Sequence, residues 1–202
     1  LTPYKGFNIK ASMLKRSPLL SIFLIVLVDI LGMTIILPLL PFYAESLGAT
    51  PVLVGLLVST YAGCQLVAGP ILGQFSDRIG RKPVLILSQC GTFAGFLLLA
   101  FSTTLPMVFL ARVIDGLTAG NLSVAQAYIA DVTDPEKRTQ SFALIGIAFG
   151  LGFLVGPAVS GFLAGYAHTY PIFLAAGLSA TSIIATITLL PGTVKRTKEE
   201  TH

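Results

Sequence analysis

The chain has 202 residues, of which 54% are hydrophobic and only 11% are charged. Soluble domains carry about 25% charged residues, so this composition excludes a water-soluble fold. The formal net charge is +4, but all the basic residues except Arg112 lie between and outside the apolar runs rather than along one face. We therefore expect a lipid bilayer, and no nucleic acid, as the partner of this surface.

The apolar runs predict an all-α membrane bundle. A polar, basic amino-terminal segment covers 1–18, and a polar tail or linker covers 191–202. Between them a six-helix transmembrane bundle is expected over 19–190. Its predicted spans are about 19–42, 51–75, 83–101, 105–130, 139–164 and 171–190, each close to the roughly 20 residues that cross a bilayer core. No strand-like alternation competes with these helices.

The positions of the basic residues predict an orientation. Of the 13 Lys and Arg residues, only Arg112 falls inside a span. The others precede the first span, follow the last, or occupy the second and fourth loops. Six crossings place these four segments on one side, which the positive-inside rule makes cytoplasmic. We expect an integral, multi-pass protein of the plasma or inner membrane, with both termini in the cytoplasm.

Two glycine–proline pairs indicate an internal repeat. Gly69-Pro70 lies in the second span and Gly156-Pro157 in the fifth, while Asp29 and Asp115 occupy similar positions in the first and fourth. Two triplets of three spans have opposite topologies because three is odd. The bundle is therefore expected to consist of two inverted three-helix repeats, an arrangement typical of secondary transporters.

Asp29 is the strongest candidate for chemistry within a span. A charged aspartate in a bilayer core costs about 3 kcal/mol, so it is usually paired, protonated or exposed to water. It is either tied to a neighbouring helix or placed as a proton or substrate site on a cavity, and we favour the second interpretation. Gln65 and Gln126 are further candidates for the cavity wall, although each could instead bridge two helices.

Arg112 and Asp115 are three residues apart, so they lie on one face of the fourth span and can pair. The arginine stays charged even when it is desolvated. One interpretation is a local structural ion pair. The other, which we favour, is a proton-coupling set in which Arg112 faces Asp29 or another carboxylate across the cavity.

No nucleotide-binding loop, catalytic triad or metal-ligand cluster is visible in the sequence, so we expect neither an enzyme nor a cofactor. The two cysteines, Cys64 and Cys90, both lie in apolar runs. We interpret them as small core residues rather than as a disulfide or a metal pair.

The most specific motif, GQFSDRIGRKP, runs from Gly73 to Pro83 between the second and third spans. Gly80 permits a tight reversal, and Pro83 suits the first turn of a helix. A basic loop that merely sets topology explains the cations but not the complete arrangement. The motif resembles the signature of the major facilitator superfamily. That resemblance implies a cytoplasmic gating cluster consisting of Gly73, Asp77, Arg78, Gly80, Arg81, Lys82 and Asp131.

In that cluster the resemblance implies that Asp77 contacts the other half of a transporter and that Arg81 pairs with Asp131. Three further stretches strengthen the likeness. LARVIDG, ending at Gly116, resembles the fourth-span motif, and 127–138 is similar to a loop of tetracycline and multidrug efflux proteins. The fifth span resembles the motif associated with antiporters, which implies helix packing or bending at Gly152, Gly156, Pro157 and Gly161.

The resemblance implies the amino-terminal six-helix half of a twelve-helix drug:proton antiporter. Its partners would be protons, a small organic or drug-like solute and a second six-helix half, with the proton gradient as energy source. Two departures argue against tetracycline itself. The third span has no acidic residue where the tetracycline exporters resembling this chain carry an aspartate, and Ser160 replaces a glycine. A nutrient symporter or facilitator is one alternative, and a non-transporting scaffold or receptor is another.

Overall fold

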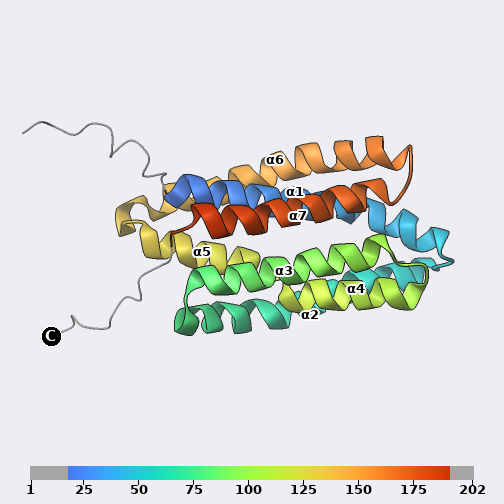
Figure 1. Ribbon diagram of the computed structural model, residues 1–202, viewed down its shortest axis with the longest axis horizontal. Coiled ribbons are helices and arrows are strands. Elements are labelled where there is room, and N and C mark those ends of the chain that lie inside the picture. The colour runs from blue at the N-terminus through green and yellow to red at the C-terminus, as the bar shows by residue number, and fades with distance from the viewer. Residues whose placement is uncertain (1–17, 192–202) are drawn as a thin grey trace, which may run out of the picture.

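The computed structural model describes residues 18–191, and within that range the chain is helical without a strand (Figure 1). The predicted amino-terminal segment and carboxy-terminal tail lie outside the described residues, apart from Pro18 and Pro191. The helices are α1 Pro18–Ser46, α2 Pro51–Ile79, α3 Arg81–Ala100, α4 Leu105–Thr118, α5 Asn121–Val132, the 3-10 turn η2 Pro135–Lys137, α6 Arg138–Ala164 and α7 Tyr170–Leu189. The predicted all-α bundle is confirmed.

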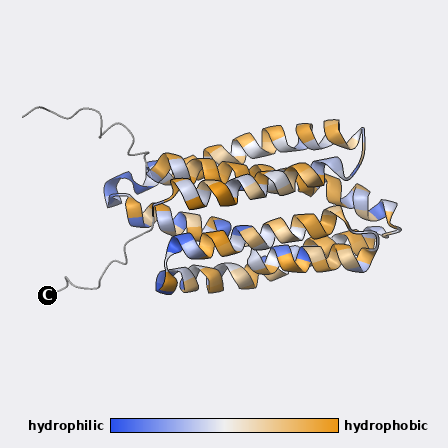
Figure 2. Ribbon diagram, viewed as in Figure 1, coloured by the Kyte–Doolittle hydropathy of each residue, from blue (hydrophilic) through white to orange (hydrophobic). Residues whose placement is uncertain are grey.

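Six segments are long and apolar enough to cross a membrane: α1, α2, α3, α4 with α5, η2 with α6, and α7. They lie roughly side by side, and apolar residues colour most of their length (Figure 2). Several helices extend beyond the predicted spans. α1 reaches Ser46, and α2 continues to Ile79. The first part of the GQFSDRIGRKP motif is therefore helical rather than a loop.

Gly80 alone makes the turn between α2 and α3. Its φ is +105°, a conformation that residues with a side chain rarely adopt. Its N–H donates to the Ser76 carbonyl at 3.0 Å, and α3 begins at the next residue. The tight reversal expected at this glycine is present.

The fourth span differs from the prediction of one continuous helix. α4 ends at Thr118 and α5 begins at Asn121, so Ala119 and Gly120 interrupt it. Ser88 of α3 bonds two of the backbone groups that the break releases. Its hydroxyl donates to the Thr118 carbonyl and accepts the Gly120 N–H at 3.0 Å. Inside a membrane, a side chain of a neighbouring helix can form the hydrogen bonds that a broken helix loses.

The spans pack as two groups of three. α1 packs against α6 and α7, while α4 packs against α2 and α3, and the contact between α3 and α7 joins the groups. Exchanging the first three spans with the last three reproduces these pairings. This is the pattern that an internal repeat produces.

Glycines allow the closest helix approaches within these groups. A Cβ added at Gly156 would collide with Thr34 of α1, and one at Gly116 would lie 2.7 Å from Cys64 Cβ of α2. Gly161 has open space around it instead. Cys64 is partly buried, but Cys90 is exposed on the bundle surface. The prediction that Cys90 is a core residue is therefore wrong: in lipid, an apolar environment does not require a position inside the bundle.

The buried apolar side chains form two separate clusters. One packs around Leu39, Leu99 and Ile172 at one end of the bundle, and the other packs around Ile25, Leu85 and Tyr128 at the opposite end. Along α3 and α7, polar residues occupy the stretch between the clusters. These include Gln89 and Ser182, which are completely buried. The middle of the bundle is thus its polar layer.

Candidate functional site

A cavity of about 260 Å3 opens in this middle layer. Its walls come from α1, α2, α3, α5, α6 and the break in the fourth span. Asp29 and Gln65 both line it, as the sequence suggested for each. Gln126 does not belong to the lining and is exposed on α5. The full lining is Val26, Asp29, Ile30, Met33, Gln65, Thr92, Ala119, Asn121, Leu122 and Phe149.

The polar partners of Asp29 come from three other helices. Gln89 Nε2 of α3 donates to Asp29 Oδ2 at 3.4 Å, and the same nitrogen donates to Ser182 Oγ of α7 at 2.7 Å. Asn121, the first residue of α5, also lies beside the carboxyl group. Asp29 is therefore both a cavity residue and a residue tied to neighbouring helices, so the two interpretations of its position are compatible.

Gln89 is one of the partners of Asp29 that sequence reasoning missed, together with Asn121 and Ser182. Its side chain is 0% exposed, and its Oε1 has no hydrogen-bond partner among the described residues. Asn121 Oδ1 is unpaired in the same sense. The signal available for Gln89 was a glutamine inside the apolar run of the third span, the span that has no acidic residue.

The break in the fourth span explains how Asn121 reaches the cavity. Because α4 stops at Thr118, the chain can turn at Ala119 and Gly120 before α5 starts. Ala119 and Asn121 then lie on the cavity wall. The amino-terminal end of α5, which carries a partial positive charge, is thereby placed at the polar layer.

Arg112 and Asp115 form a separate, deeply buried pair. Arg112 Nη1 lies 3.2 Å from Asp115 Oδ2, and the two residues are 5% and 4% exposed. The guanidinium carbon is 5.7 Å from the centre of the Tyr61 ring and 5.9 Å from that of Phe96, distances at which aromatic rings attract a cation. Neither member of the pair belongs to the cavity lining, so the structure brings Arg112 to Asp115 rather than to Asp29.

Thr92 connects the two polar groups. It lines the cavity together with Asp29, and it also lies beside Asp115. Gly95, one turn further along α3, allows α4 to approach so closely that an added Cβ would be 2.9 Å from Asp115 Cβ. The buried ion pair is therefore packed directly behind one wall of the cavity.

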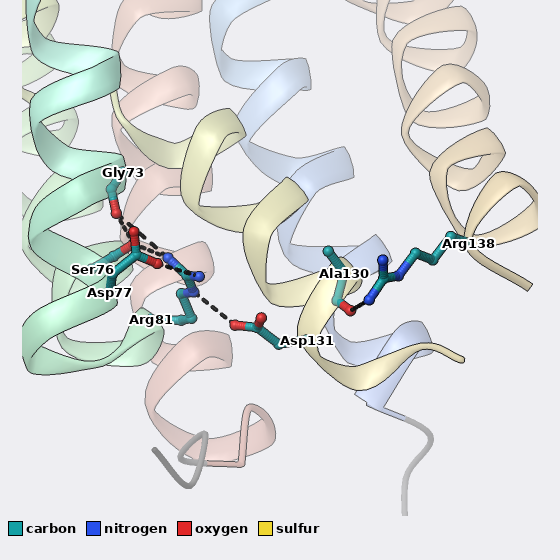
Figure 3. A network of polar contacts seen from close by, with 7 residues as sticks. All are labelled: Gly73, Ser76, Asp77, Arg81, Ala130, Asp131 and Arg138. Atoms are coloured by element: carbon teal, nitrogen blue, oxygen red, sulfur yellow. Dashed lines mark hydrogen bonds and ion pairs between the residues drawn. The ribbon is translucent and has the colours of Figure 1, made fainter. Parts of the chain in front are cut away.

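At one end of the bundle, Arg81 joins α2, α3 and α5 (Figure 3). Its guanidinium lies 2.5 Å from Asp77 Oδ1 and 2.8 Å from Asp131 Oδ2. It also donates to Ser76 Oγ at 2.6 Å and to the Gly73 carbonyl at 3.4 Å. The expected pairing of Arg81 with Asp131 is present, and Asp77 pairs with the same arginine.

The other basic residues at this end have different contacts. Lys82 Nζ donates to the carbonyls of Ile187 and Leu190 at 2.8 and 2.7 Å, and so caps the end of α7. Arg138 donates to the Ala130 carbonyl at 3.2 Å, as Figure 3 shows. Arg78 is exposed. Hydrophilic residues gather at this end of the bundle in Figure 2.

Residues 22–202 match the Major Facilitator Superfamily. The chain belongs to this family. Its curated relatives include the class H tetracycline resistance protein of Pasteurella multocida, which is 36% identical over 180 residues, or 87% of this chain and 44% of the relative. The class B tetracycline resistance protein of Escherichia coli is 36% identical over 163 residues, or 79% of this chain and 41% of the relative.

The quinolone resistance protein NorA of Staphylococcus aureus is 29% identical over 168 residues, which cover 83% of this chain and 43% of NorA. Among solved structures, the human organic anion transporter MFSD10 (TETRAN) matches with a TM-score of 0.78 and 28% identity, over 86% of this chain and 47% of that protein. The chain spans less than half the length of these relatives. It is an integral, multi-pass membrane protein of a transporter family, and its relatives are transporters rather than enzymes.

Proposed function

We propose that this chain is one half of a proton-coupled antiporter that exports a small organic solute, with Asp29 as the site of protonation. One observation carries the proposal. The cavity in the middle of the bundle is lined mainly by apolar side chains, and Asp29 is the only ionisable residue among the described residues of its lining. An ionisable group inside a membrane is expensive to keep, which makes it a functional site by default.

Antiport of a proton and a solute can arise because both would occupy the same cavity. The apolar wall, including Met33, Leu122 and Phe149, suits the hydrophobic part of a solute, while Gln65 and Thr92 offer hydrogen bonds. A proton neutralises Asp29 and removes its attraction for polar or cationic solute groups. If the cavity opens to each side of the membrane in turn, proton entry can drive solute exit. The names of the tetracycline and quinolone resistance relatives agree with solutes of this size and character.

Arg112 takes a supporting part in this proposal. Asp115 balances its charge, and Thr92 lies between the pair and the cavity. Two nitrogens of the guanidinium, Nε and Nη2, have no partner among the described residues. They are available to a carboxylate or a solute when the cavity changes shape. In this proposal Arg112 and Asp115 do not bind the proton themselves, but they can supply charged groups to the cavity when it changes shape.

A second six-helix bundle is proposed to complete the cavity. Only 17% of the residues in the apolar part of α2 and 22% in that of α6 are buried, against 50% in α1. The exposed faces of α2 and α6 are therefore available to another bundle, in the same full-length protein or in a second copy. The length of the relatives, more than twice that of the matched segments, favours the same protein.

The Arg81 cluster is proposed to lie at the cytoplasmic face and to brace the gate there. By the positive-inside rule, the end that carries Arg81, Lys82 and Arg138 faces the cytoplasm. Exposed ion pairs are worth about 0–1 kcal/mol each. Contacts of that strength can break and re-form as the two halves rock.

The proposal is tested with the complete transporter in proteoliposomes that enclose a pH-sensitive dye. A quinolone and ethidium serve as probe solutes, because the natural solute is not identified. Antiport predicts that protons move opposite to the probe, and that Asp29→Asn abolishes this exchange. Movement of protons and probe in the same direction would support a symporter. Unchanged exchange in Asp29→Asn would show that Asp29 does not couple proton and solute movement. A wild-type protein that moves neither probe nor protons would favour a non-transporting scaffold.

A further inference from the structure

We propose that Gln89 is a positioning residue for proton exchange, whose amide reverses its hydrogen bonds when Asp29 gains a proton. The inference rests on the proposed function of Asp29. It deepens that proposal by assigning Asp29 a partner on α3 that lies outside the motifs resembling the family. It stands on the geometry of three side chains from three helices: Asp29 of α1, Gln89 of α3 and Ser182 of α7.

The orientation of the amide in the structure suits a charged Asp29 carboxylate. Gln89 Nε2 donates one hydrogen to Asp29 Oδ2 and the other to Ser182 Oγ. A charged carboxylate only accepts hydrogen bonds, so the amide must turn its NH2 towards it. Gln89 Oε1 is consequently left without a partner, although burying an unpaired carbonyl oxygen costs free energy. The same amide, turned so that Oε1 faces Asp29, would use this oxygen as an acceptor.

Protonation supplies that arrangement. A protonated Asp29 carries an O–H, which needs an acceptor, and an amide turned by half a revolution offers Oε1 in the place of Nε2. The Ser182 hydroxyl can donate as well as accept, so its bond to Gln89 reverses direction instead of breaking. The Asp29 carboxyl group and the Ser182 hydroxyl can then keep their hydrogen bonds to Gln89 both with and without the proton. α1, α3 and α7 can keep their contacts while the proton enters and leaves.

Asn121 contributes a second amide of the same kind. It faces the carboxyl group from α5, and its Oδ1 is also unpaired. The groups that face Asp29 from α3, α5 and α7 are therefore amides and a hydroxyl, and the α2 and α6 residues of the cavity wall, Gln65 and Phe149, carry no charge either. Arg112 and Asp115 of α4, which lie behind Thr92, pair with each other. Protonation of Asp29 should therefore change its hydrogen bonds rather than an ion pair.

The test replaces the amide and measures protonation directly in the complete transporter. Gln89→Met keeps the length of the side chain but can neither donate nor accept. Ser179→Ala is the matched control, because Ser179 donates to the Gln89 backbone carbonyl at 3.3 Å. The control removes a bond between α3 and α7 but leaves the amide intact. Infrared difference spectra between low and high pH report the protonated carboxyl band, which Asp29→Asn identifies by its loss.

We expect Gln89→Met to move this carboxyl band to higher frequency, because its hydrogen bond to Oε1 is lost, and we expect Ser179→Ala to leave it in place. The midpoint of the pH profile should also move upwards by about one pH unit in Gln89→Met. The bond to the charged carboxylate is stronger than the bond to the neutral acid, so its loss favours the protonated form.

The two proposals fail in different ways. If the wild type shows no band that Asp29→Asn removes, Asp29 does not titrate and the proposed function fails. If the band is present but neither its frequency nor its midpoint changes in Gln89→Met, the role of Gln89 is refuted while that of Asp29 survives. Should Gln89→Met not accumulate in the membrane, Gln89→Asn gives the same test, because its shorter amide no longer reaches the carboxylate.

Discussion

A methyl group added at Gly152 tests how closely α1 and α6 pack. In the structure, a Cβ at this position lies 2.5 Å from Ile30 Cγ2, and the next nearest atom is Ile30 Cβ at 3.5 Å. The first distance is a collision, whereas the second is ordinary contact. Overpacking of this kind costs about 1–3 kcal/mol. Alanine also favours the helix over glycine by about 0.5–1 kcal/mol, so we expect a net loss of about 1 kcal/mol for Gly152→Ala.

Gly150→Ala is the matched control, since it lies on the same helix with no atom within 4 Å of the added Cβ. It should be neutral or slightly stabilising. The assay is the free energy of unfolding in mixed detergent micelles. Removing Ile30 Cγ2 through Ile30→Ala should make Gly152→Ala less harmful than it is alone, because the collision partner is gone. Equal stabilities for Gly152→Ala and Gly150→Ala would refute the close packing of these helices.

Two further predictions concern the end of the bundle that carries the Arg81 cluster. Arg81→Ala removes both ion pairs to Asp77 and Asp131, whose partners are about half exposed, so we expect a loss of about 1 kcal/mol. Hydrogen–deuterium exchange in the last turn of α2 should rise about fivefold. Arg78→Ala is the control, because Arg78 is exposed, and it should leave this exchange unchanged. Equal exchange in the two variants would show that Arg81 does not stabilise this end of α2. Lys82→Met uncaps Ile187 and Leu190, so exchange should rise several-fold in the last turn of α7 and not in its first. A uniform change along α7 would contradict the local cap.

Much of the fold could be read from the sequence because a bilayer imposes one dominant requirement. Each crossing needs about 20 apolar residues, and the loops that separate them contain the basic residues. The turn at Gly80 and the pairing of Arg112 with Asp115 were also accessible, since both depend on residues adjacent in sequence. The pairing of Arg81 with Asp131 spans two helices and was expected only through the resemblance to a family.

The break in the fourth span and the position of Gln89 could not be predicted in the same way. Mean hydropathy is averaged over a whole span, so a break of two residues at Ala119 and Gly120 does not change it noticeably. The break depends on Ser88, which belongs to another helix. Cys90 shows a related difficulty. Lipid and protein interior are both apolar, so the pattern along α3 does not reveal which side faces the other helices.

The two apolar clusters have a consequence for how this bundle can change over evolutionary time. Because each end is held together by its own cluster, and Gln89, Asp29 and Asn121 lie in the layer between, substitutions in that layer leave both ends intact. The residues of the polar layer can therefore change without unpacking either apolar cluster.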